Sequence, residues 1–353
     1  MKFIHISDVH LGMNPDKGKP WEEERIKEIE ETFDKVIELC KDEEVRLLLI
    51  SGNLYDAPPT EEDLKALDEK LSALSGTRTI MIAGSSDYMA PGSPAESYKF
   101  NSKTVILPAD RTTNAYLNGI NTCITGVSYS KPIYEDSLID GINPGRAGAV
   151  NILIANGGTK MHMPFDKKYV AKKGFDYVAL GGETRPQHIL KNRMAYPGSP
   201  EPLGPKETGK RGYIEGEIDE NGKVTINWKP IAKRNYINIT VDVNQEFTEA
   251  ELTEGLFAKL RKLGYENIYT ITLKGHINRD MKFNFKKIKD RFYINDIIDR
   301  TLSSRDEENI YIENENNLIG RFIKNVRESY DIDEEIRKKA VTYGIEALIS
   351  SGE

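Results

Sequence analysis

The sequence predicts an α/β protein: a two-sheet β-sandwich flanked by helices, followed by a small α+β domain and a C-terminal helical tail. In residues 1–83, short apolar runs alternate with amphipathic helical patterns, which indicates a parallel sheet covered by helices. From residue 103 the pattern changes to short strands separated by turns, which indicates a second sheet. We divide the chain into residues 1–232, 233–312 and 313–353.

Polar side chains follow each strand predicted for the first sheet. Residues 2–6 form an apolar strand that ends at a loop with Asp8 and His10. The strand at 46–50 ends at the segment 51–56, and the strand at 79–83 ends at 84–87. Sites in such sheets lie beyond the carboxyl ends of the strands, so we expect these loops to meet at one site.

The next strands are predicted at residues 104–107, 115–117, 122–127, 151–155 and 175–180. Because most of them are short and separated by turns, we expect this second sheet to be more antiparallel than the first. Strands at 212–218 and 224–228, joined by the turn residues Asn221 and Gly222, complete the sandwich.

A β-α-β module follows residue 232. Residues 236–241 and 267–273 alternate as strands, and a capping box of Thr248 and Glu251 opens the helix between them. A similar pair, Thr60 and Asp63, opens a helix in the first domain. The tail, residues 317–350, has the pattern of two helices.

Composition favours a protein of the cytoplasm. Hydrophobic residues make up 38% and charged residues 30% of the 353 residues, and no run reaches the roughly 18 apolar residues that a membrane span needs. We expect no signal peptide and no membrane partner, and we interpret Cys40 and Cys123 as core residues of a reducing compartment.

The net charge of -7 argues against wholesale nonspecific binding of DNA. Two stretches are basic, however: residues 259–291 hold ten Lys and Arg against three Asp and Glu, and residues 160–211 hold eleven against five. They indicate either local nucleic-acid binding or solvated faces.

The strand-end segments resemble the motifs of the calcineurin-like metallophosphoesterases, in particular the SbcD-type DNA-repair exonuclease subunits. The resemblance runs over nearly the full length and rests on segments 3–12, 51–56, 84–87, 151–157, 180–184 and 196–201. It implies a metallophosphoesterase sandwich with a capping domain, and a pair of Mn²⁺ or similar ions that activate water and hold a phosphate.

Two of the seven ligand positions that the resemblance implies keep the family's residue, Asp8 and His10. Asn53 stands where the family has a bridging Asp, and its neutral amide removes one negative charge from the site. Ser86 replaces the His that acts on the leaving group. The remaining ligand positions hold Ser85, Asn156, Gly182 and Thr184.

Three hypotheses remain open. In the first, the dimetal site is degenerate, metal is absent or reduced to one weakly bound ion near Asp8, His10 and Asn53, and the chain acts as a DNA-binding or ATPase-binding subunit. In the second, the chain is an active Mn²⁺-dependent exonuclease or phosphodiesterase, with His162 or His188 as substitute ligands. In the third, it is an interaction protein without a role on DNA.

Residues near the implied site also have simpler interpretations. Asp8 and His10 are expected to hydrogen-bond across the loops as remnants, as buried polar groups must. Asp56 and Asp87 are expected to brace loops, and His5 is expected to pack in the core.

The resemblance also implies partners. A basic, aromatic stretch with Lys282, Lys286, Lys287 and Lys289 suits a phosphate backbone, or equally a surface helix with a buried aromatic edge. Relatives use their tail helices to hold an SbcC-type ATPase, and a homodimer is a further expected assembly. The docking face would comprise Leu318, Ile319, Phe322 and Ile323; intramolecular packing of that face is the alternative.

Overall fold

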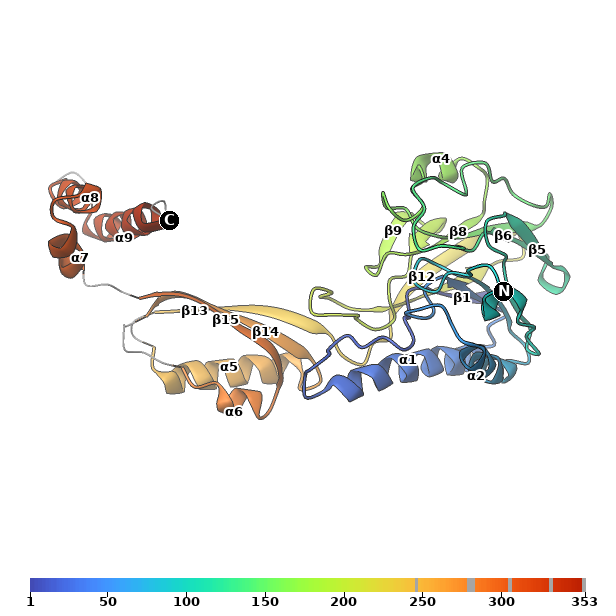
Figure 1. Ribbon diagram of the computed structural model, residues 1–353, viewed down its shortest axis with the longest axis horizontal. Helices are drawn as coiled ribbons and strands as arrows, with labels where there is room; N and C mark the ends of the chain where they lie inside the picture. Colours follow the sequence, from blue (N-terminus) through green and yellow to red (C-terminus); the bar gives the residue numbers. More distant parts are fainter. Residues whose placement is uncertain (245–246, 278–282, 304–306, 330–332, 351–353) are drawn as a thin grey trace. The chain divides into compact units, whose positions relative to one another are not determined.

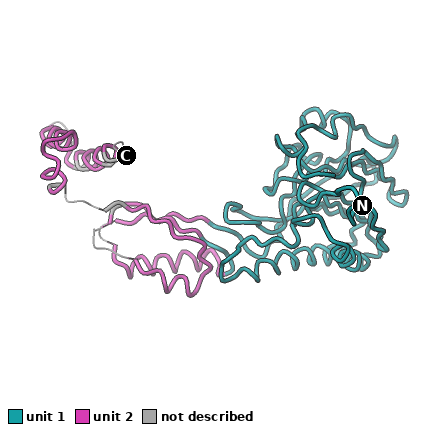
Figure 2. Tube along the Cα trace, viewed as in Figure 1, with its two compact units in different colours: residues 1–237, 266–269 teal, residues 238–265, 270–353 magenta. Residues whose placement is uncertain are grey.

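The computed structural model describes residues 1–244, 247–277, 283–303, 307–329 and 333–350. The chain forms two compact units (Figure 2). Unit 1 comprises Met1–Ile237 and Glu266–Tyr269, and unit 2 comprises Asn238–Tyr265 and Thr270–Glu353. The three-part division at residues 232 and 312 stays a prediction.

Unit 1 contains two six-stranded sheets with helices, which confirms the predicted α/β fold with two sheets (Figure 1). The first sheet has the order β12-β11-β1-β2-β3-β4, and the second has the order β5-β6-β7-β8-β10-β9. The elements of unit 1 are β1 (Lys2–Ile6), α1 (Glu22–Asp42), β2 (Leu47–Ser51), α2 (Glu61–Ser72), β3 (Arg78–Ile82), α3 (Pro94–Ser97), β4 (Thr104–Ile106), β5 (Thr113–Leu117), η1 (Asn118–Ile120), β6 (Thr122–Gly126), β7 (Val150–Asn156), α4 (Lys167–Ala171), β8 (Tyr177–Gly181), β9 (Gln187–Leu190), β10 (Met194–Tyr196), β11 (Gly212–Ile218) and β12 (Val224–Pro230).

Alternation along β1 shows how the core is layered. Ile4 and Ile6 face helices α1 and α2, whereas Phe3 faces the second sheet. His5 also faces inward and is 0% exposed, with Nδ1 2.8 Å from the Tyr177 hydroxyl and Nε2 2.7 Å from Ser51 Oγ. The prediction that His5 packs in the core is confirmed.

The second sheet is mainly parallel, so the expectation of a more antiparallel sheet is wrong. The pairs β6–β7, β7–β8 and β8–β10 are parallel, and antiparallel pairs lie at the two edges, β5–β6 and β9–β10. The long segments 127–149 and 157–176 allow crossovers between parallel strands. The short strands, taken alone, favoured hairpins.

The predicted hairpin β11–β12 is present, and it joins the first sheet beside β1. Gly222 has φ of +80°, which suits glycine, and its N–H donates to Asp219 O. The sandwich therefore closes with a strand that runs antiparallel to β1.

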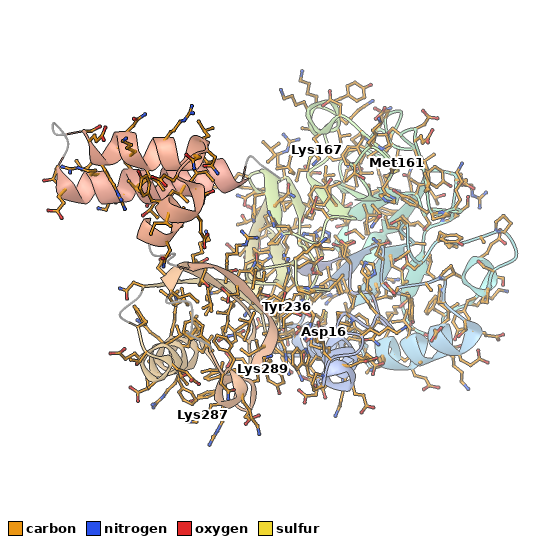
Figure 3. The ribbon with its side chains drawn as sticks, turned by 60° about the vertical axis from the view of Figure 1, so that its left-hand side comes forward. Asp16, Met161, Lys167, Tyr236, Lys287 and Lys289 are labelled. Carbon is orange, nitrogen blue, oxygen red and sulfur yellow. The ribbon has the colours of Figure 1, made fainter. Side chains whose placement is uncertain are left out.

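A buried ion network joins α1 to the last residues of unit 1. Arg25, 0% exposed, donates to Glu28, to Glu201 (3.3 Å) and to Pro202 O (2.7 Å). Asp16 accepts from the Trp21 indole (2.7 Å) and from the Tyr236 hydroxyl (2.8 Å), and Asp16 and Tyr236 are labelled in Figure 3. Arg234 donates to Glu28 and Glu24.

Unit 2 begins with the predicted β-α-β module and adds a strand. Its sheet has the order β13-β14-β15, and Thr248 and Glu251 form the predicted capping box. The sequence analysis missed β15, because polar residues interrupt its apolar pattern. The elements are β13 (Tyr236–Val243), α5 (Glu249–Leu263), β14 (Ile268–Ile277), α6 (Lys286–Lys289), β15 (Tyr293–Ser303), α7 (Glu307–Asn314), α8 (Leu318–Arg327) and α9 (Glu334–Ser350).

Helices α7, α8 and α9 share an apolar cluster built on Ile310, Ile323, Val341 and Ile345. The tail contains the two predicted helices, and α7 precedes them. Among the described residues, no helix is long and apolar enough to cross a membrane.

Candidate functional site

The loops after β1 and β2 run side by side beyond the strand ends. Asp8 N–H donates to Gly52 O (3.1 Å), and His10 N–H donates to Asn53 O (3.0 Å). Asp8, His10 and Asn53 have φ of +53°, +54° and +54°, a conformation that Asp, Asn and His tolerate better than most residues. The backbone therefore brings these three predicted site residues together.

Asp8 is 1% exposed and lies at the centre of the site. Its Oδ1 accepts from Asn53 Nδ2 (2.8 Å), and its two carboxylate oxygens lie 3.1 and 3.0 Å from the N–H of Gly182. Burial raises the pKa of Asp8, and the charge of His10 and these hydrogen bonds oppose part of that rise.

Asn53 connects Asp8 to the loop after β3. Its Oδ1 accepts from both the N–H and the hydroxyl of Ser86, each at 3.0 Å. The Ser86 hydroxyl also lies 2.7 Å from Tyr55 O. Asn53 therefore uses its amide N–H toward Asp8 and its oxygen toward Ser86.

His10 pairs with Asp56, with Nδ1 2.9 Å from Asp56 Oδ1, and its side chain is 15% exposed. Burial lowers the pKa of His10, but the hydrogen bond to Asp56 and the charge of Asp8 raise it more, and the net direction is upward. The prediction that Asp56 braces a loop is confirmed by this contact.

Asp87 holds the loops after β2 and β3 together. Its carboxylate accepts from the N–H groups of Gly84 (2.6 Å), Asn53 (3.0 Å) and Leu54 (2.7 Å). Asp87 is 4% exposed, and burial raises its pKa against these hydrogen bonds. Its predicted bracing role is confirmed.

Asn156, at the end of β7, fills the space between the strand ends. It is 0% exposed, its Nδ2 donates to Ser51 O (2.8 Å), and its Oδ1 has no hydrogen-bond partner among the described residues. A Cβ added at Gly52, Gly84 or Gly182 would lie 2.6, 2.8 or 3.0 Å from this amide. The Asn156 amide is the nearest group at Gly52, whereas Asn53 Oδ1 (2.3 Å) is nearer at Gly84 and the backbone N of Gly157 (2.9 Å) at Gly182, so a side chain at any of the three would crowd its neighbours.

Two tyrosines that the sequence analysis did not assign a role support this end of the sheet. Tyr129 Oη donates to Asn156 O (3.0 Å), and Tyr196 Oη donates to Gly157 O (2.9 Å). The Lys167 ammonium lies 4.8 Å from the Tyr196 ring centre; Lys167 is labelled in Figure 3. Tyr196 lies in segment 196–201, which is one of the segments that carry the family resemblance. That resemblance was the signal in the sequence that could have identified Tyr196.

The other predicted ligand positions lie apart from these contacts. Ser85 and Thr184 are half-buried, and Thr184 O accepts from Ser199 N–H (3.0 Å). His188 is exposed on β9, and His162 contributes its backbone O to Gly158 N–H (2.9 Å).

The donor set around Asp8 differs from what two divalent ions need. A two-metal site holds its ions with several carboxylates and imidazoles. Around Asp8 the side chains are one imidazole together with amides and hydroxyls, and the carboxylates of Asp56 and Asp87 are bonded to His10 and to backbone N–H groups. No three His, Cys, Asp or Glu side chains among the described residues are grouped to hold a metal ion.

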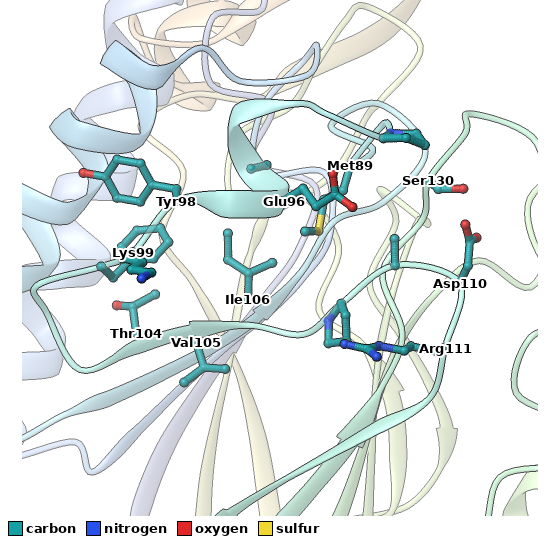
Figure 4. A pocket seen from close by; sticks show the side chains of 15 residues that line it. Met89, Glu96, Tyr98, Lys99, Thr104, Val105, Ile106, Asp110, Arg111 and Ser130 are labelled. Carbon is teal, nitrogen blue, oxygen red and sulfur yellow. The ribbon is translucent and has the colours of Figure 1, made fainter.

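A separate hollow of about 630 Å³ lies in unit 1 between the segment 89–100 and strand β4 (Figure 4). Its lining mixes aromatic, cationic and acidic side chains, including Tyr98, Arg111 and Asp110. It includes none of the predicted ligand positions.

The predicted DNA-binding lysines lie in unit 2. Lys286, Lys287 and Lys289 are exposed on α6, which buried Ile288 anchors; Lys287 and Lys289 are labelled in Figure 3. Lys282 lies outside the described residues.

The predicted docking face in the tail is divided between surface and core. Leu318 is 67% exposed, whereas Ile323 is 0% exposed. Ile319 and Phe322 are partly buried against the cluster of α7, α8 and α9.

Comparisons with known proteins add independent findings. The family model for calcineurin-like phosphoesterases matches residues 1–192. The chain is 25% identical over 285 residues to the DNA double-strand break repair protein Mre11 of Methanopyrus kandleri, covering 71% of this chain and 61% of that protein. It is 23% identical over 292 residues to the protein of the same name from Sulfolobus acidocaldarius, covering 74% and 71%.

Proposed function

Because the chain belongs to the calcineurin-like phosphoesterase family, we propose that it is an Mre11-like DNA-repair subunit whose own dimetal site is degenerate. Family membership rests on the match to residues 1–192. The chain spans 61% of the first curated relative. The activity and partners of whole relatives therefore enter only as parts of this proposal.

The contact of Asn53 with Asp8 carries the proposal. At the position of the family's bridging carboxylate, Asn53 directs an N–H donor at the carboxylate that would bind the metal, at 2.8 Å. A metal bridge requires an oxygen that faces both ions, and this amide oxygen is already bonded twice by Ser86. The residues present therefore do not fit two divalent ions.

A second candidate is a site that holds a single ion. It is favoured by the buried Asn156 Oδ1, which has no hydrogen-bond partner among the described residues, together with Asp8 and His10. Oxygen and imidazole donors of this kind suit Mn²⁺. A single bound ion would be compatible with the second hypothesis, an active exonuclease with a shifted ligand set.

DNA binding through the capping domain is the second part of the proposal. The exposed Lys286, Lys287 and Lys289 on α6 supply positive charge, and the curated relatives are named for repair of DNA double-strand breaks. Lysines that contact phosphates supply affinity without sequence preference. Docking of an SbcC-type ATPase on the tail helices, through a face that includes exposed Leu318, is proposed on the family resemblance.

Cleavage and binding can be tested on the same DNA. We expect the full chain to bind linear duplex DNA, and to cleave it with Mn²⁺ no faster than the Asp8→Ala variant. Lys286→Glu/Lys287→Glu should weaken binding about tenfold or more and lower the salt dependence by about two released ions. The matched control is Lys41→Glu/Lys65→Glu, which reverses two exposed lysines on α1 and α2.

Two results would contradict the proposal. Mn²⁺-dependent cleavage that Asp8→Ala abolishes would show that the site works and support the second hypothesis. Absence of DNA binding by the unmodified chain would favour the third hypothesis, an interaction protein without a role on DNA.

A further inference from the structure

Arg211 is a buried cation whose hydrogen bonds are missing. Its side chain is 2% exposed at the start of β11, and a guanidinium carries five N–H donors. Among the residues that the structure describes, none accepts a hydrogen bond from this side chain, and its buried Nε has no partner. A buried group left in this state costs free energy unless a partner arrives.

Glu207 does not supply that partner. Its Oε2 lies 3.7 Å from Arg211 Nη2, which is beyond hydrogen-bonding distance. The same oxygen accepts from the N–H of Leu203 at 2.9 Å. The Glu207 carboxylate therefore offsets part of the charge without satisfying the donors.

The buried guanidinium of Arg25 also has an Nε without a hydrogen-bond partner among the described residues, but its other two nitrogens are hydrogen-bonded. Arg25 is 0% exposed and donates to Glu28, Glu201 and Pro202 O. Arg234 is 6% exposed and donates to Glu28 and Glu24. Among the described residues, Arg211 differs from Arg25 and Arg234 in that its side chain has no such hydrogen bond and only the Glu207 carboxylate at 3.7 Å.

The charge of a second guanidinium acts on the first. Burial is the main cause that lowers the pKa of Arg211, and the positive charge of Arg185 lowers it further, while Glu207 and Glu183 oppose the shift. Arg185 is exposed. Two cations that repel one another form an arrangement that a bound oxyanion stabilises.

The loop that carries Arg185 begins at the candidate site. Gly182 donates its N–H to Asp8, and the chain then continues through Glu183 and Thr184 to Arg185. Thr184 O accepts from Ser199 N–H (3.0 Å), which fixes this loop against the segment that follows β10. Arg185 therefore lies three residues beyond a contact of Asp8.

We propose that Arg211 and Arg185 bind a phosphate group of DNA that lies beside the Asp8 site. Arg185 makes the solvent-facing contact, and Arg211 completes the buried one. The inference rests on the proposed function, since it takes the phosphate to be a phosphodiester of bound DNA. Free phosphate shares the same chemistry and is separated by the experiment.

The test measures phosphate and DNA separately on the full chain. Thermal unfolding is followed in inorganic phosphate and in NaCl at equal ionic strength, and binding of a short DNA duplex is followed by fluorescence anisotropy. The variants are Arg211→Lys, Arg211→Met and Arg185→Ser. The control is Arg111→Ser, which removes one exposed arginine elsewhere in unit 1.

We expect phosphate to raise the melting temperature of the unmodified chain more than NaCl does, and Arg211→Met to lose that difference. DNA binding should weaken about tenfold in Arg185→Ser and in Arg211→Lys, because a charge-assisted contact is lost or its fork geometry is changed. Arg111→Ser should bind as the unmodified chain does. Arg185 is exposed, so its variant tests the site even if an Arg211 variant fails to fold.

The outcomes distinguish failure of the proposed phosphate site from failure of the proposed function in DNA binding. Normal DNA binding and normal phosphate stabilisation in Arg185→Ser and Arg211→Lys would overturn the phosphate site and leave the proposed function standing. Stabilisation by phosphate that depends on Arg211, in a chain that binds no DNA, would support the anion site, assign it to free phosphate and overturn the DNA part of the proposal.

Discussion

Asn53 shows how a single atom changes the chemistry of the strand-end site. Its Nδ2 lies 2.8 Å from Asp8 Oδ1, where the Asp that the family resemblance implies would place a second carboxylate oxygen. Two buried carboxylates at that distance repel unless a cation lies between them. The amide removes the repulsion and satisfies Asp8 without metal.

Replacing Asn53 by Asp should therefore destabilise the metal-free protein. We expect Asn53→Asp to lower the free energy of unfolding at pH 7 by about 2–4 kcal/mol, since it exchanges a hydrogen bond for a buried like-charge contact. Urea denaturation measures the change, with Asn118→Asp on an exposed turn as the control. Unchanged stability without metal would contradict this interpretation of the contact.

His5 gives stability a defined pH dependence. Burial lowers its pKa from 6.5 to about 3. Between these pH values His5 is therefore protonated in the unfolded chain and neutral in the folded chain. The free energy of unfolding should then fall as pH drops from 6.5 toward 3, by up to about 1.4 kcal/mol per pH unit from this residue. His5→Gln, compared by denaturation across that range, should show a flatter dependence; an equal slope would contradict the assignment.

At the scale of elements, the ends of β1, β2, β3, β7 and β8 carry the candidate site. Their loops are fixed by backbone hydrogen bonds, by the Asp87 carboxylate and by the Asn156 amide. The loops are therefore held by polar contacts within the chain.

The ion network around Arg25 connects α1 with segments far along the chain. We expect Arg25→Met to lower the free energy of unfolding by about 3–5 kcal/mol, because Glu28 and Glu201 would remain buried without this partner. Lys27→Met on the same helix is the control, since its side chain is 74% exposed. Equal effects of the two variants in urea denaturation would show that the network adds little.

The strands of the first sheet could be predicted from sequence because each apolar run ends at a polar loop. Polar interruptions hid β15, and the crossovers that make the second sheet parallel lie in segments without a clear periodic pattern. The convergence of Asp8 and Asn53 followed from parallel strands and could be predicted. The packing of the Asn156 amide against three glycines could not be predicted from the sequence, because it depends on contacts between distant loops.

On the scale of the whole molecule, the chain is acidic, with a net charge of -7, yet it presents exposed lysines on α6 and a buried guanidinium near the strand-end loops. Phosphate contacts of this kind position a nucleic acid without reading its sequence. A subunit that binds DNA without cutting it needs such contacts and no dimetal centre. Under the proposed function, these cations are the features that would serve binding of DNA.

Metal stoichiometry tests the central claim most directly. Calorimetric titration of the full chain with Mn²⁺, repeated on Asp8→Ala, counts the ions and assigns them to the strand-end site. The account predicts at most one weakly bound ion per chain, lost in Asp8→Ala. Two tightly bound ions per chain that depend on Asp8 would contradict it.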